Sequence, residues 1–233
     1  MNILCVIPAR GGSKGLKNKN IKHLLGRPLI AYTIEAALKS KLANKVAVST
    51  DDPKIARVAE RYGVQVIDRP KKYATDTAPI ELALRHSVSY LKAEENYVTD
   101  IIVWLQANLP VRKTGQIDNV IKKLISGNAD SAVTVSPVEQ FPQWMKKMDK
   151  RNFLHPLVNN SKHYRRQDIK PLYRLDGAIV AIKAKVLMST KNLRGVHVFL
   201  GKRTIGVIQD KKYSIEIDSK EDFELVKHTF KKV

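Results

Sequence analysis

A stretch of glycines and basic residues near the start of the chain has the composition of an anion-binding loop. Residues 8–20 read Pro-Ala-Arg-Gly-Gly-Ser-Lys-Gly-Leu-Lys-Asn-Lys-Asn and directly follow an apolar run. Glycines allow a close approach of the backbone to a ligand, and successive backbone N–H groups form a concavity that binds anions. Four cations can neutralise charge there: Arg10, Lys14, Lys17 and Lys19. We therefore expect a triphosphate-binding loop; the alternative is a flexible surface loop.

Two common phosphate-binding fingerprints do not describe this loop. It lacks Gly-Lys-Ser/Thr at the spacing of a Walker loop. It also lacks the Gly-x-Gly-x-x-Gly pattern of dinucleotide-binding folds. The sequence therefore indicates a nucleotide site of another type.

Two carboxylates near the end of the chain, Glu216 and Asp218, flank Ile217. If this segment is a strand, alternation places both carboxylates on one face. Mg²⁺ prefers one or two carboxylates together with phosphate oxygens and water, so the pair could hold a metal; the alternative is an ordinary solvated edge. A second acidic pair, residues 51–52, precedes Pro53 and fits the N-terminus of a helix better.

Short apolar runs alternate with helical patterns over the first 135 residues. Strands are predicted at 3–7, 45–49, 64–67, 100–105 and 131–135. Helices are predicted from Pro28, from Pro53, from a cap at Asp76-Thr77 to about Leu91, and over 117–125. This order predicts a parallel sheet with helices on both faces. Such sheets bind ligands at the carboxyl ends of their strands, which is where the loop at 8–20 begins.

The pattern changes after the fifth predicted strand. Residues 137–176 show little periodicity, and we interpret them as an insertion, either a β-hairpin arm or an active-site flap. Strands are expected again at 177–182 and 204–208, followed by a helix from Ser219. Since no linker-like tract or internal repeat interrupts the chain, residues 1–233 are predicted to form one domain with this insertion.

Composition excludes several classes of protein. A content of 43% hydrophobic residues excludes a disordered polymer, and no apolar run approaches a membrane span. The single cysteine, Cys5, excludes a disulfide framework or a multi-cysteine zinc site. The N-terminal apolar run lacks a basic segment before it, so we expect a cytoplasmic protein rather than a secreted one.

The net charge of +20 leaves a nucleic-acid-binding protein as an alternative. The basic surplus, however, is not concentrated in an arm or tail, and aromatic residues make up only 6% of the chain. We therefore expect a lysine-rich surface and an anionic small-molecule substrate, with no nucleic acid and no membrane as partner.

The loop and several later motifs together resemble the acylneuraminate cytidylyltransferases, the CMP-sialic acid synthetase family. The first motif is Ile7-Pro8-Ala9-Arg10-Gly11-Gly12-Ser13-Lys14-Gly15 with Lys19-Asn20. Further matches follow in the family's order over almost the whole chain: Ser49-Thr50-Asp51, Arg69-Pro70, Asp76-Thr77-Ala78, Leu105-Gln106, Pro110, Arg112, Arg166-Gln167-Asp168, Gly177-Ala178-Ile179 and Ile215-Glu216-Ile217-Asp218.

The resemblance implies an α/β fold of three layers, with a mostly parallel sheet of nucleotidyltransferase (Rossmann-like) type and an inserted dimerisation arm. It implies an enzyme that joins CTP to a nine-carbon α-keto acid sugar with Mg²⁺, giving the CMP-sugar and pyrophosphate, and that forms a homodimer. A related sugar nucleotidyltransferase, such as one of CMP-octulosonate type, is the alternative within enzymes.

The resemblance also assigns expected roles to individual residues. Nucleotide contacts are expected from Ala9, Arg10, Gly11, Ser13, Lys14, Lys19, Asn20, Arg69 and Ala78. Catalytic roles are expected for Arg10, Lys14, Lys19 and Asp218. Gln106, Asp176 and Arg166 are expected at the sugar, with Arg166 reaching it from a partner subunit, and Asp218 with Glu216 at the metal. For Arg166 the alternative is a place in the solvated basic surface.

The chain departs from the family's pattern mainly where the sugar is expected. Ala107-Asn108-Leu109 stands where Pro-Thr-Ser is usual, Asp176 replaces asparagine, and Val180 replaces a frequent tyrosine. Glu216 stands where aspartate is common, which leaves its metal ligation open. These departures leave the sugar open among sialic, legionaminic and pseudaminic acids and their relatives.

Overall fold

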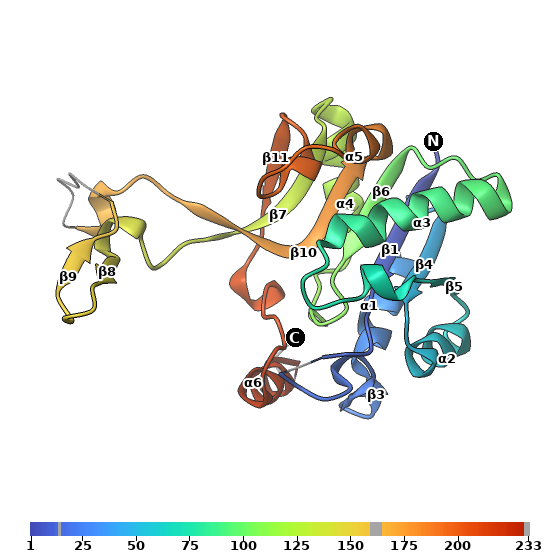
Figure 1. The fold of residues 1–233 in the computed structure, drawn as a ribbon, viewed down its shortest axis with the longest axis horizontal. Coiled ribbons are helices and arrows are strands. Elements are labelled where there is room, and N and C mark those ends of the chain that lie inside the picture. Colours follow the sequence, from blue (N-terminus) through green and yellow to red (C-terminus); the bar gives the residue numbers. More distant parts are fainter. Residues whose placement is uncertain (14, 159–164, 231–233) are drawn as a thin grey trace.

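A twisted central sheet organises the protein. The computed structural model describes residues 1–13, 15–158 and 165–230. Within these residues seven strands form one sheet of order β11-β7-β10-β6-β1-β4-β5 (Figure 1). The strands are β1 (Ile3–Pro8), β4 (Lys45–Thr50), β5 (Gln65–Asp68), β6 (Ile101–Leu105), β7 (Ser131–Pro137), β10 (Tyr173–Lys183) and β11 (Thr204–Ile208).

The sheet is mostly parallel, as predicted. β1 pairs in parallel with β4 and β6, β4 with β5, and β11 with β7. Only β10 runs against its neighbours β6 and β7 among the strands that the structure describes in this sheet. Six strands therefore present their carboxyl ends at one edge, where open sheets of this kind place ligand sites.

Apolar residues on both sides of each central strand explain the three-layer architecture. In β1, Ile3, Cys5 and Ile7 belong to the core on one face, and Leu4 and Val6 to the core on the other. The first face is covered by α1 (Leu29–Leu38), α2 (Pro53–Arg61) and α4 (Gln116–Ser126), and the second by α3 (Ile80–Glu95) and α5 (Ala184–Ser189). Both layers of helices are thus held by apolar burial.

A third, smaller core joins the C-terminal helix to the body. α6 (Lys220–Phe230) places Phe223 and Val226 against Leu24 and Tyr32, close to the short ribbon of β2 (His23–Leu24) and β3 (Arg27–Pro28). Ile217, which is fully buried, belongs to the same core. The segment just before α6 is therefore anchored beside the carboxyl edge of the sheet.

Residues between β7 and β10 leave the body as a β-hairpin arm. β8 (Lys146–Met148) pairs antiparallel with β9 (Leu154–Pro156), and Figure 1 shows this hairpin far from the sheet at the end of two extended segments. Of the two interpretations of the insertion, the hairpin arm matches its shape. The part of the insertion at residues 159–164 lies outside the described residues.

The structure corrects two predictions about local elements. α3 begins at Ile80 and not at Asp76-Thr77, because Ala78 precedes Pro79, and a residue before proline is disfavoured in helical conformation. Residues 214–218 form no strand; they run as irregular chain between a 3-10 turn (Lys211–Tyr213) and α6. Burial of Ile217, and not a sheet ladder, is what turns Glu216 and Asp218 the same way.

Candidate functional site

A cavity of about 550 Å³ opens at the carboxyl edge of the sheet. Its wall combines the ends of three strands, represented by Pro8 at the end of β1, Arg69 after β5 and Gln106 after β6. Nine of the residues expected at the site line it: Arg10, Ser13, Lys19, Asn20, Arg69, Ala78, Gln106, Glu216 and Asp218. The fold therefore brings together side chains up to about two hundred positions apart in the sequence.

Glycines in the loop after β1 are required by close packing. A Cβ on Gly11 would lie 2.4 Å from the Asp52 carboxylate, and one on Gly15 would lie 2.4 Å from the backbone oxygen of Asp218. The Gly11 amide donates to Asp51 Oδ1 at 3.2 Å. The loop is thus packed between the start of α2 and residues 214–218, which carry Glu216 and Asp218 and are called the carboxylate segment below. This packing fixes the path of the loop along the cavity.

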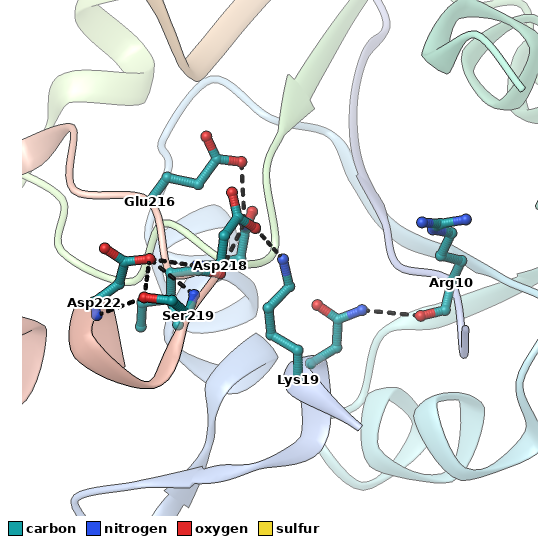
Figure 2. A network of polar contacts seen from close by, with 9 residues as sticks. Arg10, Lys19, Glu216, Asp218, Ser219 and Asp222 are labelled. Carbon is teal, nitrogen blue, oxygen red and sulfur yellow. Dashed lines mark hydrogen bonds and ion pairs between the residues drawn. The ribbon is translucent and has the colours of Figure 1, made fainter. Parts of the chain in front are cut away.

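Two loop cations lie in the cavity wall, each beside a carboxylate. Arg10 Nη1 pairs with Asp76 Oδ1. Lys19 Nζ lies 2.5 Å from Asp218 Oδ1, a pair that Figure 2 shows. The buried Asn20 donates from Nδ2 to the backbone oxygen of Arg10 at 3.1 Å and so stabilises the loop backbone at Arg10. Both cations are therefore positioned to neutralise a polyanion in the cavity.

The remaining loop residues divide by position. Ala9 is buried at the end of β1, and Gly11 faces the acidic residues before α2. Lys17 is exposed and does not line the cavity. Lys14 lies outside the described residues, so its predicted contact with the triphosphate stays a prediction.

Arg69 lines the cavity and has guanidinium donors without a hydrogen-bond partner. The residue is 5% exposed, and its Nε and Nη2 atoms are buried without a hydrogen-bond partner. Burial lowers the pKa of this guanidinium, and Asp51, whose Oδ1 lies 3.8 Å from Nη2, partly offsets that effect. Unpaired buried donors are costly, so a ligand with oxygen or nitrogen acceptors is the natural partner for Arg69.

Glu216 and Asp218 form a carboxylate pair in the wall of the cavity. Asn108 Nδ2 lies 3.0 Å from Glu216 Oε1 and 3.2 Å from Asp218 Oδ1, so both carboxylates converge on one amide (Figure 2). No group of three His, Cys, Asp or Glu side chains suited to a metal occurs among the residues that the structure describes. A metal here would need phosphate or water oxygens to complete its ligand set.

The start of α6 holds the backbone of this pair. Asp222 Oδ2 accepts from the backbone N–H groups of Asp218 at 3.0 Å and Ser219 at 2.8 Å, and Ser219 Oγ accepts from the Asp222 N–H at 3.1 Å. This reciprocal arrangement is a capping box. The donors Asp218 N–H and Ser219 hold the pKa of Asp222 below its ordinary value. Helix α6 therefore begins at a point that also orients Asp218.

A second cavity, of about 210 Å³, adjoins the first and shares Trp104, Gln106 and Glu216 with it. Gln106 Oε1 is buried without a partner, and Gly177, with φ +69°, leaves room for this side chain, because a Cβ there would lie 2.9 Å from Gln106 Nε2. The two cavities together could accommodate a nucleotide and a second substrate on either side of Gln106.

Asp176 lines the second cavity, but its carboxylate is already engaged. It accepts hydrogen bonds from Thr134 at 2.5 Å, Ser136 at 2.8 Å and Gln209 at 2.9 Å. Its predicted contact with a sugar stays a prediction, and the geometry gives it a supporting part in the cavity wall. Arg166 lies in a 3-10 turn on the arm and lines neither cavity, at least within the described residues.

Three residues of this site were not assigned a role from the sequence. Arg112 donates to the backbone oxygens of Gln106, Leu109 and Ala178 and so closes the turn after β6; burial lowers the pKa of its guanidinium to about 9. Asn108 and Asp222 hold the carboxylate pair. The pattern Ser-x-x-Asp at 219–222 is a sequence signal for a cap and could have identified Asp222. Arg112 was one of the matches to the family's pattern and Asn108 part of a departure from it, but neither position indicated these contacts.

Comparison with known proteins matches this chain to nucleotidyltransferases. The family model described as Cytidylyltransferase matches residues 4–228. The N-acylneuraminate cytidylyltransferase of Streptococcus agalactiae is 31% identical over 99% of this chain and 54% of its own length. The CMP-N,N'-diacetyllegionaminic acid synthase of Legionella pneumophila is 36% identical over 82% of each protein. The chain thus spans about half the length of the streptococcal relative.

A solved structure supports the same fold at lower sequence identity. CMP:2-keto-3-deoxy-manno-octonic acid synthetase, solved with CTP, superimposes with a TM-score of 0.74 at 19% identity, covering 100% of this chain and 99% of that one. In the described part of the chain, none of the helices has the length and apolar character needed to span a membrane.

Proposed function

Because this chain belongs to the cytidylyltransferase family, we propose that it joins CTP to a nine-carbon α-keto acid sugar and releases pyrophosphate. The observation that carries this proposal is one cavity lined by the cations Arg10, Lys19 and Arg69 and by the carboxylates Glu216 and Asp218. Cations together with a carboxylate pair suit a polyphosphate with a bound divalent metal. The similar relatives are named for this chemistry on sialic and legionaminic acids.

CTP is assigned to the larger cavity. Its triphosphate would lie along the loop after β1, held by Ser13, Arg10, Lys19 and, by resemblance, Lys14. By the same resemblance, its cytidine would lie toward Arg69 and Ala78. The support for this orientation is that Arg10, Ser13, Lys19, Arg69 and Ala78 all line this one cavity.

The reaction is an in-line displacement at the α-phosphorus. A hydroxyl oxygen of the sugar bonds to that phosphorus, the bond to the bridging oxygen breaks, and pyrophosphate leaves with the electron pair while the hydroxyl loses its proton. Positioning and charge neutralisation dominate such transfers. Arg10 and Lys19 supply positive charge fixed by their carboxylate partners, so little reorganisation is needed during the step.

Mg²⁺ is the metal that this donor set fits. Asp218 and Glu216 offer hard oxygens, and the Asp218 side chain is 62% exposed, so water and phosphate oxygens would have access to a metal held there. When bound, Mg²⁺ would offset the charge of the phosphate oxygens. Asp218 is assigned the direct contact and Glu216 a contact through water, because Glu216 stands where the family commonly has the shorter aspartate.

The sugar is assigned to the smaller cavity, with Gln106 and Asp176 in its wall. By resemblance to the family, its carboxylate is assigned to Arg166 of a second copy; in agreement with this, Arg166 is not among the described residues that line either of these cavities. Arginine binds carboxylates through two parallel hydrogen bonds. This places the substrate between two subunits and makes a homodimer part of the proposal.

The arm is the segment that would form this dimer. Its described side chains include several large apolar groups that are exposed: Trp144, Met145, Met148, Phe153, Leu154, Leu157 and Val158. Exposed apolar surface of this kind marks interaction sites, and a second copy of the chain would bury it. We place the reaction in the cytoplasm, where CTP is available.

Nucleotide binding is tested directly by thermal unfolding with each nucleoside triphosphate and Mg²⁺. A ligand that binds only the folded state raises stability with its concentration. We expect a clear rise in Tm with CTP and a small one with ATP or GTP, and Arg69→Met should abolish the difference. Equal shifts with CTP and ATP would refute the cytidine assignment.

A further inference from the structure

Asn108 occupies the point where the two carboxylates meet. It follows β6 in the turn closed by Arg112 and is 8% exposed. Its Nδ2 atom lies 3.0 Å from Glu216 Oε1, 3.2 Å from the backbone oxygen of Ile217 and 3.2 Å from Asp218 Oδ1 (Figure 2). Its own backbone oxygen accepts from the Ile217 N–H at 3.0 Å. Asn108 thus holds residues 216–218 against the turn after β6 through both its side chain and its backbone.

These hydrogen bonds matter because the carboxylate segment is not paired with any strand of the sheet. Residues 214–218 are irregular chain, so hydrogen bonds of a strand do not fix the directions of Glu216 and Asp218. Ile217 anchors the segment in the core, and the Asn108 side chain sets where the two flanking carboxylates point. Two like charges near one another repel, and a donor between them offsets that repulsion.

The chemistry of the amide suits this position. It donates hydrogen bonds without carrying charge, so the pair keeps its attraction for a cation, whereas a lysine there would cancel part of it. An amide NH₂ has two hydrogens and faces three acceptor oxygens, so one acceptor can turn to a metal without leaving a donor unpaired. Lys19 Nζ contacts the same Asp218 oxygen, so part of the charge of Asp218 is already offset and a second cation at position 108 would offset more.

We propose that Asn108 is a positioning residue that holds Glu216 and Asp218 together as a divalent-cation site. The inference rests on the proposed function, which assigns the metal to this pair. Partners that orient metal ligands are worth about 10- to 100-fold in metal affinity, so loss of the Asn108 amide should weaken metal binding on that scale while leaving the metal-independent contacts of CTP in place.

Mn²⁺ is the probe for this test, because its binding to the nucleotide-free protein can be followed by electron paramagnetic resonance. Asp218→Asn should abolish Mn²⁺ binding. Asn108→Ala should weaken Mn²⁺ binding by about tenfold or more and leave the affinity for CTP, measured in EDTA, unchanged. The Mg²⁺ concentration for half-maximal turnover should rise similarly, and saturating Mg²⁺ should restore most of kcat. Asn108→Ser is the second variant, for use if the alanine variant does not fold. Because it keeps a single O–H donor, it should lose less Mn²⁺ affinity than is expected of Asn108→Ala.

Asn44→Ala is the matched control, since the Asn44 side chain accepts from the Ile3 N–H at the other end of the sheet. It should lower stability and leave Mn²⁺ binding unchanged. Unaltered Mn²⁺ binding in folded Asn108→Ala, or an equal loss of metal-free CTP binding, would overturn the positioning role. Wild-type Mn²⁺ binding in Asp218→Asn would instead show that the metal assignment itself is wrong.

Discussion

At the scale of single residues, Arg10 gives the most direct test of the proposed phosphate-binding loop. It lines the cavity, and its pairing with Asp76 fixes the guanidinium near the loop. Arg10→Ala should lower turnover by about a hundredfold or more, the scale of one lost electrostatic donor in a transition state. Thermal unfolding should change little, because the side chain is partly exposed. Arg57→Ala, on the exposed side of α2, is the control. Near-normal turnover of a folded Arg10→Ala protein would leave the loop without its proposed role.

The two carboxylates should differ in their dependence on metal. Asp218→Asn removes an anionic oxygen from a site with few protein ligands and should abolish Mg²⁺-dependent turnover. Glu216→Gln should raise the Mg²⁺ requirement but keep activity at high Mg²⁺, since this side chain is expected to act through water. Turnover measured across a Mg²⁺ series separates the two variants. Wild-type turnover of Asp218→Asn at low Mg²⁺ would place the metal elsewhere.

At the scale of elements, the capping box of α6 links helix stability to the site. Hydrogen bonds from the N–H of Asp218 and from Ser219 hold the pKa of the Asp222 carboxyl group below its ordinary value. A lowered pKa in the folded state adds stability above the unfolded value of about 4, and this stability is lost as the pH falls through the folded pKa. Asp222→Asn should therefore destabilise the protein at pH 7 by about 0.5 to 1 kcal/mol, and the difference from wild type should shrink below about pH 4. Denaturant unfolding at several pH values measures it, and a difference independent of pH would contradict the role of the charge.

The same substitution should also act on catalysis. Asp222 accepts from the backbone of Asp218, so its loss should lower turnover as well as stability. Glu224→Gln is the matched control, because Glu224 is on the same helix and its carboxylate pairs with Lys227 on the surface. It should alter neither property appreciably.

Elements with a strong apolar pattern could be predicted, and those defined by distant contacts could not. Runs such as residues 3–7 are buried on both faces in a central strand, so their sequence alone indicates a strand. The direction of β10 depends on the arm that precedes it, and its apolar run resembles that of a parallel strand. The carboxylate segment looks like a strand by alternation, yet burial of Ile217 against α6 sets its course.

The candidate site was predictable to a similar degree. Residues near the strand ends, such as Arg10, Arg69 and Gln106, could be expected at one edge because parallel strands share it. Asn108 could not, because its contacts join positions more than a hundred residues apart through an irregular loop. Asp76 was expected to cap a helix and instead pairs with Arg10. The sequence did not indicate this pair, because the two residues are 66 positions apart in the chain.

At the scale of the whole molecule, the arm is proposed to form a dimer. Leu154→Asp places a charge on β9, where the side chain is 66% exposed, and should shift the protein to monomer in sedimentation velocity. Sugar-dependent turnover should fall with it, because Arg166 would no longer reach a neighbouring site. Leu193→Asp, at an exposed leucine outside the arm, is the control and should leave the association state unchanged. A monomeric wild-type protein with full activity would refute the shared site.

Mixing inactive variants tests the same point by function. Arg10→Ala and Arg166→Ala proteins are each expected to be inactive, but a mixed dimer contains one site with both wild-type residues. Activity should partly return once subunit exchange has been demonstrated, for example by mass spectrometry. Exchange without recovery would show that Arg166 acts within its own chain or has no part in the reaction.

Pyrophosphate release tests the central claim most directly. It should be measured with CTP, UTP, ATP and GTP in turn, each with Mg²⁺, with and without a panel of nonulosonic acids and an eight-carbon octulosonic acid. The account predicts rapid release with CTP and at least one nine-carbon acid, and very little when either is omitted or replaced. Release that does not depend on the sugar, release that is equal with ATP, or release only with the eight-carbon acid would contradict it.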